Sequence, residues 1–523
     1  MSVRVRAGAA ASVLVLATAL AGCDSSPGAP ASVDDAKRTG SAPPAASSRA
    51  PSPAGGGLPA ALTGQRPDWR ACSAPAGGSA PGGEWRCATV RVPLDYAKPS
   101  GTTIPLALIR KEARDGDRRI GSLLFNFGGP GGSGVDTLPR AADEYGRLNE
   151  RYDLVSFDPR GVSRSAGVVC RDDAEQAAAE SRVDLTPDTP AEEAAYLKDG
   201  ADFGAGCARR SGRLLPHVGT SDAARDLDLV RQVLGDAKLN YFGISYGTQL
   251  GGTYAHLFPA KVGRTVLDAV VDPTADTVGH ARNQTTGFQR ALDNYLRSTG
   301  EDPAKGTARI TRLLRSIDAK PLPTDSGRKL TDGLALTGIV LPLYSQGNWP
   351  LLTSALAQAE RGVGSELLRL ADAYNDRDRD GHYSTQSHSQ RAISCADSKA
   401  RPTAAQARAL LPEFRRISPV FGEFLAWDTA GWCANWPVPG ERDTPEASAP
   451  GAGPVLVVGT TGDPATPYEG AKKMADELGA GVGVLLTNKG EGHGAYGTAA
   501  CVTRTVDAYL LDGKVPANGT TCP

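Results

Sequence analysis

Ser245 lies at the centre of the segment 243–247, whose sequence GISYG has the pattern G-x-S-x-G. Such a segment can form a nucleophile elbow, a sharp strand-to-helix turn from which a serine hydroxyl attacks a carbonyl carbon. The glycines are needed because the turn leaves no room for side chains beside a strained serine. The pattern alone is weak in a chain with 62 glycines, but an apolar run over 239–242 precedes it and small residues over 246–252 follow it. We therefore predict that Ser245 is a nucleophile; the alternative is an ordinary glycine-rich turn.

A serine hydroxyl is a poor nucleophile unless a base accepts its proton. Among the six histidines, His493 follows an apolar run over 482–486 and lies in a Gly-His-Gly loop close to the C-terminus. His256 instead falls within the helix expected after Ser245, where a packed side chain is the simpler interpretation. We predict that His493 is the base; a solvated loop histidine is the alternative.

The acid that orients this histidine should follow a strand between the nucleophile and the base, in the hydrolase order Ser, Asp, His. Asp463 meets this condition, because an apolar run over 454–458 leads into its loop. Its carboxylate would hold the imidazole of His493 in one tautomer and stabilise the imidazolium. Asp268 and Asp272, which follow an earlier apolar run, are the alternatives.

The negative charge that develops on an attacked carbonyl oxygen requires two backbone N–H groups. Tyr246, the residue after the nucleophile, would supply one of them. The other is expected from the glycine-rich segment 128–134, in which Gly131 and Gly132 are both favoured. The segment does not fit a phosphate-binding P-loop, because no Lys-Ser or Lys-Thr pair follows its glycines.

Short apolar runs alternate with helical patterns along much of the chain. One helix is expected to begin after an N-cap at Thr220, Ser221 or Asp222 and to end before Gly235. Strand–helix alternation with nearly continuous apolar strands predicts an α/β fold, with a mostly parallel sheet covered on both faces. The expected strands include 123–127, 154–157, 239–242, 265–267, 454–458 and 482–486.

The pattern changes between about 275 and 450, where apolar residues recur at helical spacing and strand-like runs are scarce. We interpret 275–449 as a mainly helical cap inserted before the strand that carries the catalytic acid. The core is then divided into a first part, 61–274, and a C-terminal part, 450–523, which holds the aspartate and the histidine.

The first residues indicate export. Residues 1–22 contain two arginines and an apolar run that is too short to span a bilayer comfortably. The run ends in Leu-Ala-Gly-Cys, which resembles a bacterial lipobox, so we expect cleavage before Cys23 and lipidation of Cys23. The segment 23–60 is almost wholly Ala, Ser, Pro and Gly, as in a flexible tether. We predict a protein held by its lipid on the extracellular face of the membrane; a plain signal peptide is the alternative.

The cysteines support an oxidising location. Nine cysteines minus Cys23 leave eight, and an even number in an exported protein predicts disulfides. Eight cysteines allow 105 pairings. Their clustering favours pairs between neighbours along the chain, namely Cys72 with Cys87, Cys170 with Cys207, Cys395 with Cys433, and Cys501 with Cys522.

Charge and ligand spacing exclude several other classes. The net charge of −1 gives no electrostatic reason to expect nucleic acid as a partner. No cysteine or histidine spacing indicates a zinc site. The segment 376–381 resembles the start of a calcium loop, but Ser387 stands where the loop needs glutamate, so we interpret it as a solvated turn. No metal or cofactor is expected.

Taken together, the motifs resemble the tripeptidyl aminopeptidase branch of the prolyl-aminopeptidase-like serine peptidases, which have an α/β-hydrolase fold. The resemblance extends over essentially the whole chain after the tether, including the helical insertion. It rests on segments 87–88, 92–96, 128–134, 153–161, 243–247, 392–397, 463–467 and 492–494, the last ahead of Cys501.

The resemblance implies removal of short peptides, typically tripeptides, from free N-termini, with Ser245, Asp463 and His493 as the triad. Phe127 stands where some relatives have a histidine, which argues against a strict single-proline aminopeptidase. Such a peptidase also needs an acid to receive the substrate ammonium; Glu469 lies near the triad in sequence, but no acid is singled out. An exported carboxylesterase or lipase with the same triad is the alternative. A lipid-anchored binding protein is a second alternative. The intact triad argues against it, because a binding protein needs none of the three residues.

Overall fold

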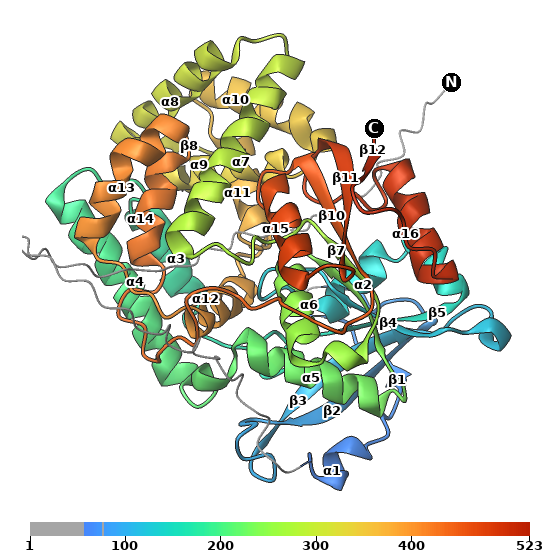
Figure 1. Cartoon of the computed structure of the whole chain (residues 1–523). Helices are drawn as coiled ribbons and strands as arrows, with labels where there is room; N and C mark the ends of the chain where they lie inside the picture. Colours follow the sequence, from blue (N-terminus) through green and yellow to red (C-terminus); the bar gives the residue numbers. More distant parts are fainter. Residues whose placement is uncertain (1–56, 76–77) are drawn as a thin grey trace, which may run out of the picture.

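The computed structural model describes residues 57–75 and 78–523. The predicted leader 1–22, Cys23 and most of the tether lie outside these residues. The centre of the molecule is a ten-stranded sheet (Figure 1). In spatial order its strands are β1 (Arg70–Ala71), β2 (Trp85–Pro93), β3 (Thr103–Lys111), β5 (Tyr152–Phe157), β4 (Gly121–Asn126), β6 (Leu239–Ile244), β7 (Val262–Asp268), β10 (Val455–Gly462), β11 (Gly483–Glu491) and β12 (Thr520–Cys522).

Most of this sheet is parallel, as predicted. Every neighbouring pair from β5 to β12 is parallel, whereas β1, β2, β3 and β5 pair antiparallel with one another in turn. Parallel neighbours require crossover connections, which helices supply here. All six residues of β4 and all six of β5 are buried, which explains why these strands are continuous apolar runs in the sequence.

Helices cover both faces of the sheet (Figure 1). The alternation of side chains along β4 sends Leu124 into one apolar cluster and Leu123 into another on the opposite face. The first cluster includes residues of α5 (Thr220–Val233), α6 (Tyr246–Leu257) and α15 (Tyr468–Leu478). The second includes residues of α2 (Gly134–Ala141) and α16 (Ala500–Asp512).

The helix expected from the pattern after residue 220 is α5, but its N-cap differs from the prediction. Gly219 occupies the N-cap position and makes no side-chain cap. The hydroxyls of Thr220 and Ser221 instead donate to the carboxylates of Asp397 and Glu441. The prediction of a side-chain cap was therefore wrong, because these polar groups are used between segments rather than within the helix.

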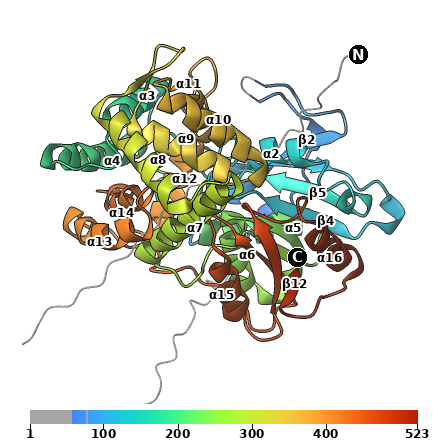
Figure 2. The same cartoon turned by 90° about the horizontal axis from the view of Figure 1, so that it is seen from above.

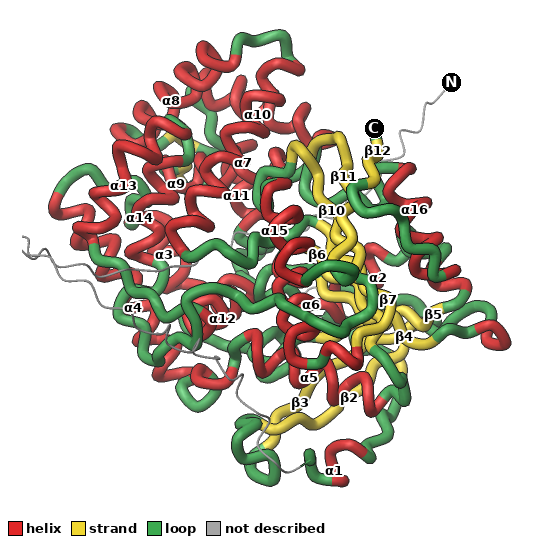
Figure 3. Tube along the Cα trace, in the orientation of Figure 1, coloured by secondary structure: helices red, strands yellow, loops and turns green. Residues whose placement is uncertain are grey.

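The chain between β7 and β10 is mainly helical, with an apolar cluster of its own. In Figures 2 and 3 these helices gather beside the sheet rather than on its two covered faces. They are α7 (Thr277–Ser298), α8 (Pro303–Ala319), α9 (Asp332–Leu343), α10 (Trp349–Glu360), α11 (Ser365–Tyr374), α12 (Gln386–Asp397), α13 (Ala404–Ile417) and α14 (Gly422–Gly431), with the short strands β8 (Leu322–Pro323) and β9 (Lys329–Leu330) between α8 and α9.

Two helices from the first part of the chain join this group. The structure places α3 (Asp173–Arg182) and α4 (Pro190–Ser211) against the inserted helices (Figure 1). Tyr196 packs edge-on against Trp427 with ring centroids 6.4 Å apart, and the Glu180 carboxylate accepts a hydrogen bond from Asn375. The helical layer is thus built from two separate stretches of sequence.

Four disulfides connect the cysteine pairs expected from their clustering: Cys72–Cys87, Cys170–Cys207, Cys395–Cys433 and Cys501–Cys522. The second ties the segment before α3 to α4, and the third ties α12 to the segment after α14. Within residues 57–75 and 78–523, no helix is both long and apolar enough to cross a membrane.

Candidate active site

Ser245 lies between the end of β6 and the start of α6, in a conformation that few residues other than glycine adopt. Its φ is 58° and its ψ is −125°, which is a strained backbone for a residue with a side chain. A Cβ at Gly243 would collide with the carbonyl of Gly247, and one at Gly247 would lie 2.5 Å from the carbonyl oxygen of Asn126. Both glycines of the motif are therefore required by close backbone contacts.

His493 and Asp463 form a buried pair. The Nδ1 atom of His493 lies 2.9 Å and 3.0 Å from the two carboxylate oxygens of Asp463. Asp463 also accepts hydrogen bonds from the backbone N–H groups of Ala465 and Thr466 and from the Thr466 hydroxyl. The Nε2 atom of His493 is buried and has no hydrogen-bond partner among the described residues. The imidazole is thus oriented on one side and presents an unpaired nitrogen on the other.

Asp268, the alternative acid, has a different environment. Its carboxylate accepts hydrogen bonds from the backbone N–H groups of Ala495 and Tyr496, and its backbone carbonyl accepts one from Ser245. Burial raises the pKa of this carboxyl despite these hydrogen bonds. Asp268 therefore connects the turn of the serine to the loop of His493. Asp272, the other alternative, pairs with Lys473 at 2.7 Å.

The helical insertion also contacts the histidine loop. The backbone carbonyl of Tyr344 accepts a hydrogen bond of 2.8 Å from the N–H of His493. The Tyr344 ring stands edge-on to the imidazole, with centroids 5.3 Å apart. No local pattern near residue 344 indicates this contact, because the two residues are distant in sequence.

The glycine loop 128–134 lies against the serine turn, but its glycines face different neighbours. A Cβ on Gly128 would lie 2.8 Å from the Cβ of Ser245 and 3.3 Å from the Tyr246 nitrogen. At Gly131 the neighbours are the carbonyl of Gln386 and the nitrogen of Gln390, both in α12. The loop is therefore held between the turn of Ser245 and the inserted helices, and the close contact of Gly128 was not predicted.

The end of this loop is held by hydrogen bonds to Asp158, which follows β5. The Ser133 hydroxyl and the Val135 N–H donate to the buried carboxylate of Asp158, at 2.7 Å and 3.2 Å. Burial raises the pKa of Asp158 to about 6. Two residues later, Arg160 is fully buried and pairs with Asp226 at 2.6 Å. The segment 158–160 thus holds the end of the glycine loop in place.

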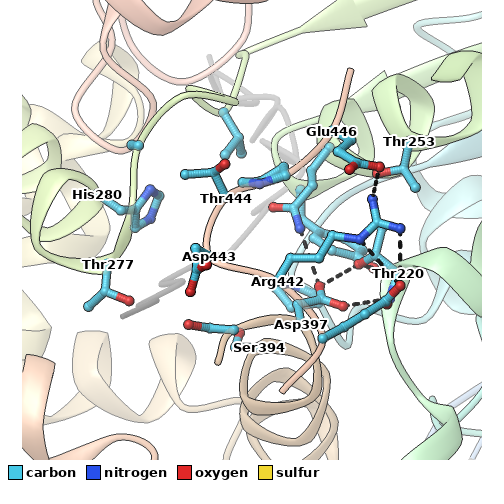
Figure 4. Close-up of a pocket in the computed structure, with 18 of the residues that line it drawn as sticks. Thr220, Thr253, Thr277, His280, Ser394, Asp397, Arg442, Asp443, Thr444 and Glu446 are labelled. Atoms are coloured by element: carbon cyan, nitrogen blue, oxygen red, sulfur yellow. Dashed lines mark hydrogen bonds and ion pairs between the residues drawn. The ribbon is translucent and has the colours of Figure 1, made fainter. Parts of the chain in front are cut away.

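A cavity of about 80 Å³ lies beside the start of α6 (Figure 4). Its wall includes Asp397, whose carboxylate accepts hydrogen bonds from the backbone N–H and the hydroxyl of Thr220. The same Thr220 hydroxyl lies 2.7 Å from the Tyr246 hydroxyl. Burial raises the pKa of Asp397 to about 7. Asp397 is thus linked through Thr220 to Tyr246, the residue that follows Ser245.

Two residues and one segment that the sequence singled out have roles other than the chemistry considered for them. Phe127 is buried and stacks with Phe125, with centroids 5.8 Å apart. Glu469 is exposed and pairs with Arg290 at 3.3 Å. In the segment 376–381, the Asp378 carboxylate accepts hydrogen bonds from the N–H groups of Asp380 and His382, which closes a turn.

Two family models match this chain, and several known proteins are similar to most of it. A family model described as "alpha/beta hydrolase fold" matches residues 121–308, and one described as "TAP-like protein" matches residues 418–522. The chain is thus an α/β hydrolase. The serine protease Hip1 of Mycobacterium tuberculosis is 37% identical over 88% of this chain and 91% of its own. The tripeptidyl aminopeptidase of Streptomyces lividans is 33% identical over 87% and 86%. A carboxylesterase B of Mycobacterium tuberculosis is 37% identical over 84% and 86%.

The chain therefore belongs to the tripeptidyl aminopeptidase-like serine peptidases of the α/β-hydrolase fold. The order Ser, Asp, His and the oriented imidazole suit nucleophilic acyl transfer.

Proposed function

We propose that the protein is an exported aminopeptidase that releases short peptides, typically tripeptides, from free N-termini through an acyl-enzyme on Ser245. The observation that carries this proposal is the buried Asp463–His493 pair with its unpaired Nε2 atom. A strained serine at the start of a helix is the matching nucleophile.

In the proposed mechanism, Nε2 of His493 accepts the proton as the Ser245 oxygen bonds to the substrate carbonyl carbon. N–H groups of Tyr246 and of Gly131 or Gly132 stabilise the oxyanion. The imidazolium, stabilised by Asp463, gives its proton to the leaving amine as the C–N bond breaks. Water then attacks the ester with His493 as base, which releases the peptide acid and restores the serine.

The names of the relatives favour a peptidase, and one of them supports an esterase as the alternative. Two of them are described as a serine protease and a tripeptidyl aminopeptidase, which supports peptide substrates with a free N-terminus. Another is described as a carboxylesterase, and an esterase would use the same three residues. A lipid-anchored binding protein has less support, because binding alone requires no oriented histidine.

We also propose export, lipidation of Cys23 and attachment to the extracellular face of the membrane. Four disulfides support an oxidising location. The proposed domains remain a core of 61–274 and 450–523 and a cap of 275–449, to which α3 and α4 contribute contacts.

The direct test compares three substrates: tri-alanyl p-nitroanilide with a free N-terminus, the same compound with an acetylated N-terminus, and p-nitrophenyl butyrate. The proposal expects the free peptide to have the highest kcat/KM. Ester hydrolysis without cleavage of the free peptide would establish the esterase instead.

A further inference from the structure

A cavity of about 240 Å³ lies within the helical layer, between α3 and α4 on one side and α9, α11, α12 and α14 on the other. It is larger than the cavity beside α6. Both stretches of sequence that form the helical layer are needed to enclose it. Its charged and amide-bearing walls include Gln176, Glu180, Asp199, Gln390, Arg391 and Asp428.

Two contacts connect the wall of this cavity with the residues proposed for catalysis. Gln386 and Gln390, which line it, belong to the turn of α12 that contacts Gly131 of the candidate oxyanion loop. Tyr374, also in its wall, lies beside Tyr344, with ring centroids 6.5 Å apart. Tyr344 in turn holds the loop of His493. The start of α12 therefore lies between the cavity and the glycine loop.

Several buried polar atoms of the wall have no partner among the described residues: the Gln176 carbonyl oxygen, the Gln390 side-chain nitrogen and the Trp432 indole nitrogen. Buried polar groups normally form hydrogen bonds, and leaving one unpaired is unfavourable. Two of these atoms are donors and one is an acceptor. An extended peptide, which carries both carbonyl and N–H groups, is complementary to such a set.

Glu180 supplies a negative charge beside the unpaired acceptor. It lies one helical turn after Gln176 on α3, and its side chain is only 9% exposed. Asn375 and Tyr383 donate to its carboxylate at 3.0 Å and 2.6 Å, and Arg328 lies at 3.3 Å. Burial raises the pKa of this carboxyl, so an added positive charge would stabilise its ionised form.

We propose that this cavity binds the N-terminal residues of the peptide substrate, with the substrate ammonium received by the Glu180 carboxylate and the Gln176 carbonyl oxygen. The inference rests on the proposed aminopeptidase function and identifies the acid that the sequence does not single out. An ammonium group has three N–H donors and one positive charge, which match a carboxylate beside an unpaired carbonyl. Three extended residues span about 10 Å, so holding the ammonium at one point selects which peptide bond can reach Ser245.

The test measures kcat/KM for free and acetylated tri-alanyl p-nitroanilide in the wild type and in Glu180→Gln. Loss of a charged hydrogen bond is expected to lower kcat/KM for the free peptide by about 10- to 100-fold. The acetylated peptide should change little, because it has no ammonium group. Gln176→Met should produce a smaller loss in the same direction, and it leaves the Glu180 ion pair with Arg328 in place.

Asp372→Asn is the matched control. Asp372 pairs with the same Arg328, at 2.6 Å, but does not line the cavity. It should retain the wild-type preference for the free N-terminus. The inference is overturned if Glu180→Gln keeps that preference, or if Asp372→Asn loses it equally. A wild type that cleaves esters but neither peptide would refute the proposed function itself, which is a distinct outcome.

Discussion

The backbone carbonyl of Tyr344 accepts a 2.8 Å hydrogen bond from the N–H of His493. Tyr344 follows α9 of the insertion, whereas His493 belongs to the loop after β11 of the core. The insertion thus contacts the candidate base directly, and it contacts the glycine loop through α12. The position of the inserted helices therefore affects both the loop of His493 and the glycine loop.

Replacing Tyr344 with alanine is expected to lower kcat by about 10- to 100-fold, because the imidazole loses the ring that packs against it. Tyr295→Ala is the control, since Tyr295 is also buried in the insertion but packs against Trp349. Both variants should lose stability, measured by thermal unfolding. Equal kcat values for the two would contradict a positioning role for Tyr344.

Asp463→Asn is expected to reduce kcat by about 10⁴-fold, because the amide favours the wrong tautomer of His493. Asp268→Asn should have a milder effect, since Asp268 accepts only backbone N–H groups in this loop. Steady-state kinetics on the tripeptide anilide compare the two. The reverse order of effects would identify Asp268 as the catalytic acid.

Gly131→Ala is expected to impair both activity and stability. A Cβ there would collide with the backbone of α12, and the φ of 99° adds strain. Gly235→Ala is the control, because Gly235 also has a positive φ, of 81°, but no atom lies within 4 Å of the added carbon. If the two variants have the same kcat, the contact between the glycine loop and α12 has no catalytic importance.

Asp397 predicts a dependence of stability on pH. Its folded-state pKa is raised to about 7, from an ordinary value of 3.8. Between these values the folded chain binds more protons than the unfolded chain, so stability should fall as the pH rises from about 4 to 7, by at most about 4 kcal/mol. Asp397→Asn should flatten the change of Tm over this range. Asp443→Asn is the control, at an exposed position in the same cavity, and it should leave the change of Tm with pH as in the wild type. Identical Tm profiles for the wild type and Asp397→Asn would contradict the assignment of this pH dependence to Asp397.

The features that the sequence predicted are those with a local signal. Apolar runs indicated β4 and β5 because these strands are buried on both faces. Neighbouring cysteines indicated the four disulfides because short separations in sequence favour those pairs. The chain order of Asp463 and His493 indicated a pair that the structure holds at hydrogen-bond distance.

Contacts between segments that are distant in the sequence could not be predicted from local patterns. The local sequence of α3 and α4 does not indicate the surface against which they pack, so their place beside the insertion was not predicted. The Tyr344–His493 hydrogen bond uses a backbone carbonyl, which any residue supplies. The role of Asp268 in the histidine loop likewise depends on strand neighbours brought together by the sheet.

Covalent labelling of the folded protein with a fluorophosphonate tests the central claim most directly. We predict one adduct, located by peptide mass spectrometry on Ser245, with loss of tripeptide anilide cleavage in proportion to labelling. Ser245→Ala should remain unlabelled and inactive while keeping the wild-type Tm. An adduct on a different residue, or full peptidase turnover in Ser245→Ala, would contradict an acyl-enzyme on Ser245.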